Sequence, residues 1–339
     1  MSSQSVRAEN KDLRKKASAF TKKYMMLFVL ILICVFFSIF GKNFFSAANA
    51  ITVCRQVSII GICAAGMMFA LLVGHIDLSI GASVSFSAVL FAKLCADPAG
   101  FGLALNPVLS IVIVLFFCAL IGVIKGLLVV ETNMPALIAT LAVSTALEGV
   151  NYLITDAKPI SKLPDSVAWI GQGYIGKIPM PVIIFAIIIV ISGFILSSTY
   201  IGRYIYATGS NTEAARLSGL NVKFVKISAY VVCTLLCGVA GFVLATRLRS
   251  GTATTGTQYQ TKSLTACTVG GISMAGGEGT IYNLLVGIFI IGIITNGMTI
   301  MGINEYWQDV VQGCILAAAV GVDAYQRTHT KKTLRANAK

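Results

Sequence analysis

Long apolar runs alternate with short polar segments along almost the whole chain. About 20 apolar residues in helical conformation are needed to cross the hydrocarbon core of a membrane, so each run is a candidate span. The pattern therefore predicts an all-α membrane protein with about ten transmembrane helices. The predicted spans cover residues 24–40, 51–73, 79–96, 108–130, 136–155, 179–197, 226–246, 262–275, 281–301 and 307–323.

Two glycine-rich segments separate apolar runs that would otherwise merge into helices too long for one crossing. Residues 74–81 read GHIDLSIG and residues 270–280 read GGISMAGGEGT. Broken backbone at membrane depth is tolerated only inside protein or beside water, and interrupted helices commonly line transport sites. The alternative is a tight turn between spans or close packing of helices through small residues. We therefore expect glycine-interrupted helices in this fold.

Composition and charge predict how the chain is organised and oriented. Hydrophobic residues make up 56% and charged residues only 12%, about half the charge of a soluble domain. Much of the net charge of +13 lies in residues 1–23 and 324–339, and cytoplasmic ends of membrane proteins retain Lys and Arg. We expect two basic cytoplasmic tails around a transmembrane domain at 24–323. This pattern does not indicate nucleic-acid binding.

A polar, basic segment at residues 198–225 follows the sixth predicted span and is therefore also expected in the cytoplasm. Within it Asn211 can cap a short helix, Glu213 suits the first turn, and Gly219 suits the position after the last turn. Ala214, Ala215 and Ser218 give this helix a small-residue face. An interfacial helix on lipid headgroups is the alternative, but it would show more bulky apolar residues. The segment favours a protein partner.

A few charged residues lie deep in apolar sequence. An isolated charge at mid-bilayer costs about 3 kcal/mol, so Asp77 needs a partner, water or the membrane boundary. His75 could pair with it, or Asp77 could cap the following helix. Lys125 and Glu148 are expected to face the bundle interior and could pair with each other.

Signatures of enzymes and of bound cofactors are absent from the sequence. It has two histidines, no GxSxG, no HExxH and no GK[ST] motif, and its nine cysteines include no CxxC pair. We expect no catalytic residues, no metal site and no cofactor in this chain. If the protein uses ATP, a partner chain has to bind it.

The sequence resembles the permease subunit of bacterial ATP-binding-cassette (ABC) importers for monosaccharides of the ribose, galactose and xylose type, over residues 50–323. The resemblance is carried by Gly66-Met67, Gly74–Gly81, Gly126–Val129, Pro135, Ile138–Leu141, Gly202-Arg203, Ala207–Gly219, Gly270-Gly271, Gly276-Gly277, Gly279 and Trp307-Gln308.

The resemblance implies an ABC importer permease fold in the bacterial inner membrane. It also implies three kinds of protein partner: a cytoplasmic ATPase subunit that binds ATP and Mg²⁺, an extracytoplasmic substrate-binding protein, and a second permease copy or paralogue. The ATPase would dock through Ala207, Gly209, Asn211, Glu213, Ala214, Ala215, Ser218 and Gly219.

The expected translocation path comprises His75, Asp77, Ser79, Lys125, Thr140, Glu148 and Asn296. The family generally has Gly where His75 stands and Asn where Lys125 stands, and it lacks a cation at Lys262. The cations Lys125 and Lys262 indicate an acidic or phosphorylated cargo, unless they pair within the protein. The other hypothesis is a proton-coupled secondary transporter with Asp77, His75 and Glu148 as its relay.

Overall fold

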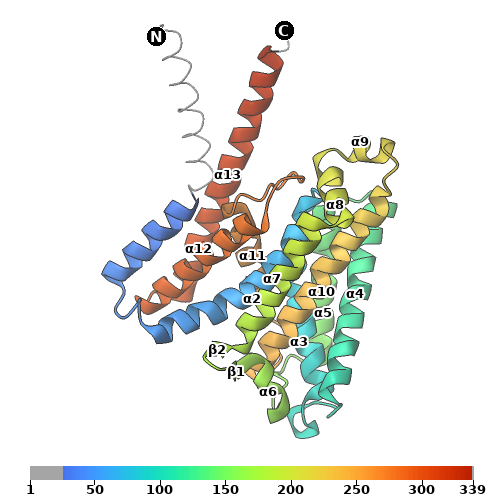
Figure 1. Ribbon diagram of the computed structural model, residues 1–339. Helices are drawn as coiled ribbons and strands as arrows, with labels where there is room; N and C mark the ends of the chain where they lie inside the picture. The colour runs from blue at the N-terminus through green and yellow to red at the C-terminus, as the bar shows by residue number, and fades with distance from the viewer. Residues whose placement is uncertain (1–25, 338–339) are drawn as a thin grey trace.

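The computed structural model describes residues 26–337, with side chains to residue 325. The predicted tail 1–23 lies outside the described residues, and so do the side chains of most of the tail 324–339. The described chain is almost entirely helical (Figure 1). The helices that coincide with the ten predicted spans are Met26–Phe40, α2 (Ala47–Leu72), α3 (Ile80–Cys95), α4 (Pro107–Glu131), α5 (Ala136–Thr155), α7 (Met180–Ser198), α10 (Val222–Leu248), α11 (Thr257–Val269), α12 (Ile281–Ile300) and α13 (Glu305–Asn337).

Among the described helices, six are long and apolar enough to cross a membrane: α2, α4, α5, α7, α10 and α12. Met26–Phe40 and α3 are apolar but shorter. The predicted span 262–275 is displaced, because α11 runs over Thr257–Val269 and the backbone turns at Gly271, where φ is +87°. The structure is thus a helical, multi-pass membrane fold, and the count of ten crossings stays a prediction.

Short elements connect the long helices. They are the 3₁₀ turn η1 (Pro98–Gly100), α6 (Asp165–Gln172), the antiparallel pair β1 (Tyr174–Ile175) and β2 (Ile178–Pro179), α8 (Tyr200–Ser210) and α9 (Thr212–Leu217). Polar caps set several helix starts: Asn106 Oδ1 accepts from Val108 N before α4, and Asn221 Oδ1 accepts from Phe224 N at α10.

Helices α2 and α10 form the centre of the bundle. In the most apolar stretch of α2, 89% of residues are buried, against 22% in α4. Large apolar side chains such as Phe116 and Leu153 are exposed on α4 and α5, as expected for a surface that faces lipid. A Cβ built on Gly122 of α4 would lie 2.6 Å from Val231 Cα of α10. Close helix approach through small residues is typical of membrane bundles.

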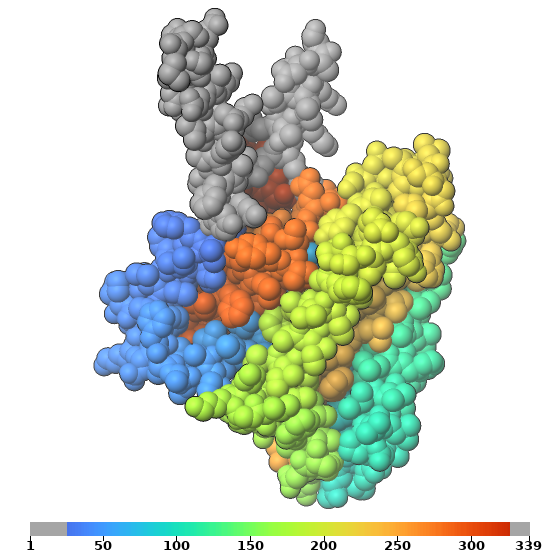
Figure 2. All heavy atoms as spheres, in the orientation of Figure 1, coloured from blue at the N-terminus to red at the C-terminus, as the bar shows by residue number. Residues whose placement is uncertain are grey.

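The bundle has two distinct ends. Helices α8 and α9 lie at one end, and α6 with the β1–β2 hairpin lies at the other (Figure 1). In the space-filling view the segment of α8 and α9, coloured yellow, projects at the surface (Figure 2). The break between α2 and α3, at residues 73–79, turns at Gly74, where φ is +81°. The glycine pattern therefore did predict a chain break there.

Candidate functional site

A buried polar cluster fixes the break between α2 and α3. Asp77 Oδ2 lies 2.5 Å from Lys125 Nζ on α4, and neither side chain is exposed. Lys125 Nζ also donates to Ser79 Oγ at 2.9 Å, while Ser79 N and Oγ donate to Asp77 Oδ1 at 2.8 and 2.6 Å. A buried ion pair is tolerated when such additional hydrogen bonds satisfy both groups. The cluster therefore attaches the break to α4.

Thr140 attaches the same break to α5. Its hydroxyl accepts a hydrogen bond from Leu78 N at 3.1 Å and donates to Ala136 O at 2.8 Å, and the side chain is fully buried. His75 makes a different contact, since its Nδ1 lies 3.2 Å from the hydroxyl of Tyr230 on α10. Burial, and next the nearby Lys226, hold the pKa of His75 at about 4, below its ordinary value. At neutral pH the imidazole is uncharged.

The partners predicted for these charged groups were partly wrong. Asp77 does have a buried partner, but it is Lys125, not His75. The helix after the break has Ser79, not Asp77, at its N-cap position. Glu148 is exposed on α5 and accepts from Ser144 on its own helix at 3.2 Å, so it neither faces the interior nor pairs with Lys125. A sequence shows that a charge is buried, but the partner depends on which helices pack together.

Asn296 is the last of the seven residues expected to line the translocation path. It is 3% exposed on α12, and its Oδ1 is buried without a hydrogen-bond partner among the described residues. The structure thus brings His75, Asp77, Ser79, Lys125 and Thr140 together at the break. In the described part of the chain, none of the seven predicted residues lines the polar cavity among α2, α10, α11, α12 and α13.

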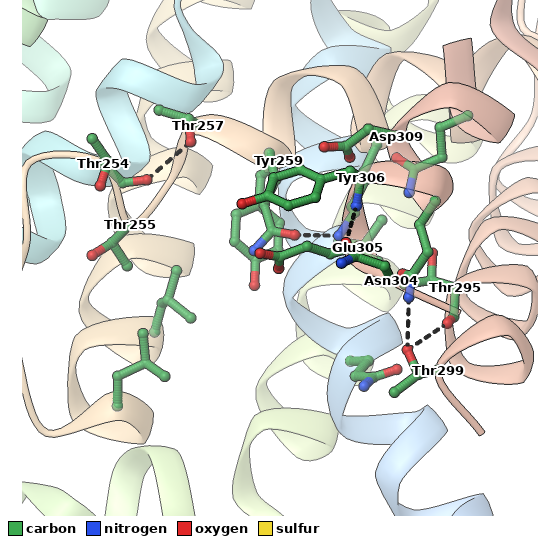
Figure 3. Close-up of a pocket in the computed structure, with 18 of the residues that line it drawn as sticks. Thr254, Thr255, Thr257, Tyr259, Thr295, Thr299, Asn304, Glu305, Tyr306 and Asp309 are labelled. Atoms are coloured by element: carbon green, nitrogen blue, oxygen red, sulfur yellow. Dashed lines mark hydrogen bonds between the residues drawn. The ribbon is translucent and has the colours of Figure 1, made fainter. Parts of the chain in front are cut away.

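That cavity has a volume of about 1020 Å³. It lies where the middle of α2 and the end of α10 meet α11, α12 and α13, and α6 packs beside its Arg247. Figure 3 shows Thr254, Thr255 and Thr257 facing Glu305, Tyr306 and Asp309 across it. The polar residues that line it are Gln56, Arg247, Thr254, Thr255, Thr257, Gln258, Tyr259, Lys262, Thr295, Thr299, Asn304, Glu305, Tyr306, Gln308, Asp309 and Gln312.

The charges of the cavity wall are balanced. Arg247 and Lys262 provide two cations, and Glu305 and Asp309 provide two carboxylates. Lys262 Nζ donates to Gln258 Oε1, one helical turn away. Gln56 Oε1 is buried and has no hydrogen-bond partner within the described residues. The wall can thus supply both donors and acceptors to an uncharged polar solute.

Most of this lining was not predicted from the sequence, although a helical spacing was present. Thr295 and Thr299 are four residues apart on the otherwise apolar α12. Glu305, Asp309 and Gln312 follow at intervals of four and three on α13. Residues at these intervals share one face of a helix. Among the lining residues, Lys262 had been noted from the sequence as a cation that the family lacks, and Gln308 as part of the resemblance.

The predicted short helix at 211–219 is confirmed. Asn211 Oδ1 accepts from Ala214 N at 3.0 Å at the start of α9, and Gly219 follows the C-cap Ser218 with φ of +84°. Glu213 pairs with Arg216 at 2.8 Å on the exposed surface. Ala207, Asn211, Glu213, Ala214, Ser218 and Gly219 are exposed, whereas Ala215 is buried and Gly209 is half-buried.

The three residues of the hypothetical proton relay have other partners. His75 contacts Tyr230, Asp77 is held by Lys125, and Glu148 is exposed and accepts from Ser144. No hydrogen bond among the described residues joins these three groups, so the structure adds no support for the relay. The arrangement instead combines a polar cavity near one end of a helical bundle with an exposed short helix at the other end.

Residues 49–320 match the model of a protein family described as the permease component of the branched-chain amino acid transport system. The chain belongs to this permease family. Permease components are transport subunits of a multi-pass membrane system in the bacterial inner membrane, rather than enzymes.

Similar proteins include sugar import permeases. The chain is 35% identical to the ribose import permease protein RbsC of Haemophilus influenzae, over 88% of this chain and 92% of that protein. It is 36% identical to RbsC of Bacillus subtilis, over 88% and 91%. It is 32% identical to the fructose import permease protein FrcC of Rhizobium meliloti, over 94% and 91%. No solved structure matches the chain.

Proposed function

We propose that this chain is the membrane-spanning permease subunit of an ABC importer for an uncharged sugar or a similar polyhydroxyl solute. The observation that carries the proposal is the charge-balanced polar cavity near one end of the bundle, with the exposed α8–α9 segment at the other end. The similarity to ribose and fructose import permeases supports the sugar assignment.

In this proposal the α6 end faces outward and the α8–α9 end faces the cytoplasm. A substrate-binding protein delivers the solute from the outside. The cytoplasmic ATPase subunit, which holds ATP and Mg²⁺, docks on α9 through its exposed residues Asn211, Glu213, Ala214 and Ser218. A second permease copy or a paralogue completes the path. Orientation follows from the basic segments, because cytoplasmic loops retain Lys and Arg.

The structure removes the support for an acidic cargo. Lys125 is fully buried and neutralised by Asp77, so its charge is not available to a solute. Lys262 does line the cavity, but two carboxylates line it as well. Hydroxyl groups both donate and accept hydrogen bonds, which suits a wall with amide, hydroxyl, cationic and carboxylate groups.

Reconstitution tests this function. The chain is coexpressed with an ABC ATPase subunit and a substrate-binding protein and placed in proteoliposomes. Uptake of labelled ribose, fructose, xylose and allose is measured with and without ATP, with ribose 5-phosphate as the acidic comparison. ATP-dependent uptake of a neutral sugar is expected. Uptake that needs a proton gradient and no ATPase would overturn the proposal.

A further inference from the structure

Three segments that are far apart in the sequence meet at the end of α8. They are the end of α2 at Leu72, the end of α8 at Gly209 and Ser210, and the α11–α12 loop at Gly276 and Gly277. Gly277 N donates to Leu72 O at 2.9 Å. A second hydrogen bond joins α8 to the loop, because the Tyr206 hydroxyl donates to Gly279 O at 2.7 Å. We call this point the glycine junction.

The glycine junction is a contact of backbone on backbone. A Cβ built on Gly209 would lie 1.8 Å from Leu72 O and 2.6 Å from Gly277 N. One built on Gly276 would lie 2.7 Å from Gly74 N and 3.0 Å from Gly209 Cα. Close-packed backbone leaves little room for independent movement. If α8 moves, Leu72 and Gly277 must move with it or lose their contacts.

The junction lies between the docking surface and the transport elements. Through Asn211, α8 continues directly into the exposed α9. Beyond Leu72 the chain enters the break that carries Asp77. The loop at Gly277 joins α11 and α12, which supply Lys262, Thr295 and Thr299 to the cavity. Gly209 therefore contacts both the end of α2 and the α11–α12 loop. Displacement of the first would alter the break, and displacement of the second would alter the cavity wall.

We propose that the glycine junction transmits movement of the ATPase-docked α8–α9 segment to α2 and to the α11–α12 loop, with Gly209 and Tyr206 as positioning residues. This inference rests on the proposed function. It also gives Gly209 a different role from the exposed residues of α9, because Gly209 contacts the permease bundle rather than presenting a surface to the ATPase.

The test compares Gly209→Ala and Tyr206→Phe with Gly149→Ala in the complex of permease, ATPase and binding protein. Gly149→Ala is the matched control, because it is helical and has open space around its Cβ. Tyr206→Phe removes one hydroxyl without changing packing, so it remains informative if Gly209→Ala fails to fold. Hydrogen–deuterium exchange of peptides covering 72–79 and 270–280 is measured with and without the ATP analogue AMP-PNP and Mg²⁺.

In the wild-type complex and the control, AMP-PNP should change exchange in both peptides. In Gly209→Ala and Tyr206→Phe that change should fall at least twofold, while the ATPase copurifies in normal amounts and retains basal hydrolysis. The inference is overturned if Tyr206→Phe and a folded Gly209→Ala both respond to AMP-PNP as strongly as the wild type. If Gly209→Ala fails to fold, an undiminished response in Tyr206→Phe alone overturns it. A wild-type complex in which the α8–α9 peptides respond and the two junction peptides do not also overturns it. Failure of the wild-type chain to bind an ATPase is a different result, which overturns the proposed function itself.

Discussion

Asp77 Oδ2 lies 2.5 Å from Lys125 Nζ, and neither side chain has exposed surface. Removing one partner of such a pair leaves an uncompensated buried charge, which costs about 3–5 kcal/mol. We expect Asp77→Asn and Lys125→Met each to lower unfolding stability by about that amount, and the double variant to lose less than the sum. Thermal unfolding in detergent measures this. Strictly additive losses would show that the pair is not coupled.

Thr140 should stabilise the break through its hydroxyl. Thr140→Val leaves the half-buried Leu78 N without its acceptor, and an unsatisfied buried donor costs up to about 1–3 kcal/mol. Thr145→Val on the exposed face of the same helix is the control, because its hydroxyl bonds only within α5. Thermal unfolding should separate the two variants. Equal midpoints would contradict the role of Thr140.

His75 should make stability depend on pH. Its pKa is lowered to about 4 in the folded protein against an ordinary value near 6.5, so between these values the unfolded chain binds the proton and the folded chain does not. The free energy of unfolding is therefore highest above pH 6.5. It falls by about 3 kcal/mol in total as the pH falls toward 4, because protonation of His75 favours the unfolded chain. His75→Gln should flatten this part of the stability profile. A variant profile as steep as the wild-type one would refute the assignment.

Lys262 should contribute to cargo binding at the cavity. A hydrogen bond from a charged donor contributes about 1.5–3 kcal/mol, so Lys262→Met should reduce uptake at subsaturating sugar by roughly 10-fold or more. Lys177→Met, in the exposed β1–β2 turn, should leave uptake unchanged. Uptake in proteoliposomes at several sugar concentrations distinguishes binding from assembly. Equal uptake by the two variants would place the cargo elsewhere.

Glu213 should matter for coupling rather than for stability. Its ion pair with Arg216 is exposed, and exposed pairs contribute about 0–1 kcal/mol. Glu213→Lys should therefore fold normally but weaken ATPase docking and abolish ATP-driven uptake. Asp156→Lys disrupts another exposed pair and serves as the control. Full uptake by Glu213→Lys would remove α9 from the docking surface.

Local sequence patterns were enough to predict the long helices, the caps of the short helix α9 and the breaks at glycine. Asn211 and Gly219 bound α9 as predicted, because capping depends on residues within a few positions of each other. Gly74 and Gly271 mark real breaks for a similar reason, since positive φ favours glycine. The end of α11 differs by several residues, because a helix boundary in a glycine-rich stretch is also set by packing.

Partners across the bundle could not be predicted in the same way. Lys125 and Asp77 are 48 residues apart, and His75 was equally available in the sequence as a partner for Asp77. The polar cavity collects side chains from five helices, so no single stretch of sequence contains it. The glycine junction is similar, because its glycines come from separate segments and look like ordinary turn residues until the segments meet.

The sequence alone determined that this protein is helical and spans a membrane, with a short capped helix after a central span, and its resemblance to importer permeases indicated the family. Apolar run length, basic segments and caps are properties of neighbouring residues, and bilayer thickness and backbone hydrogen bonding act on them directly. Only the tertiary structure decided that Lys125 neutralises Asp77, that Glu148 is exposed, and that Gly209 contacts Leu72 and Gly277. These facts depend on which helix faces pack together, and packing joins residues that the chain keeps far apart.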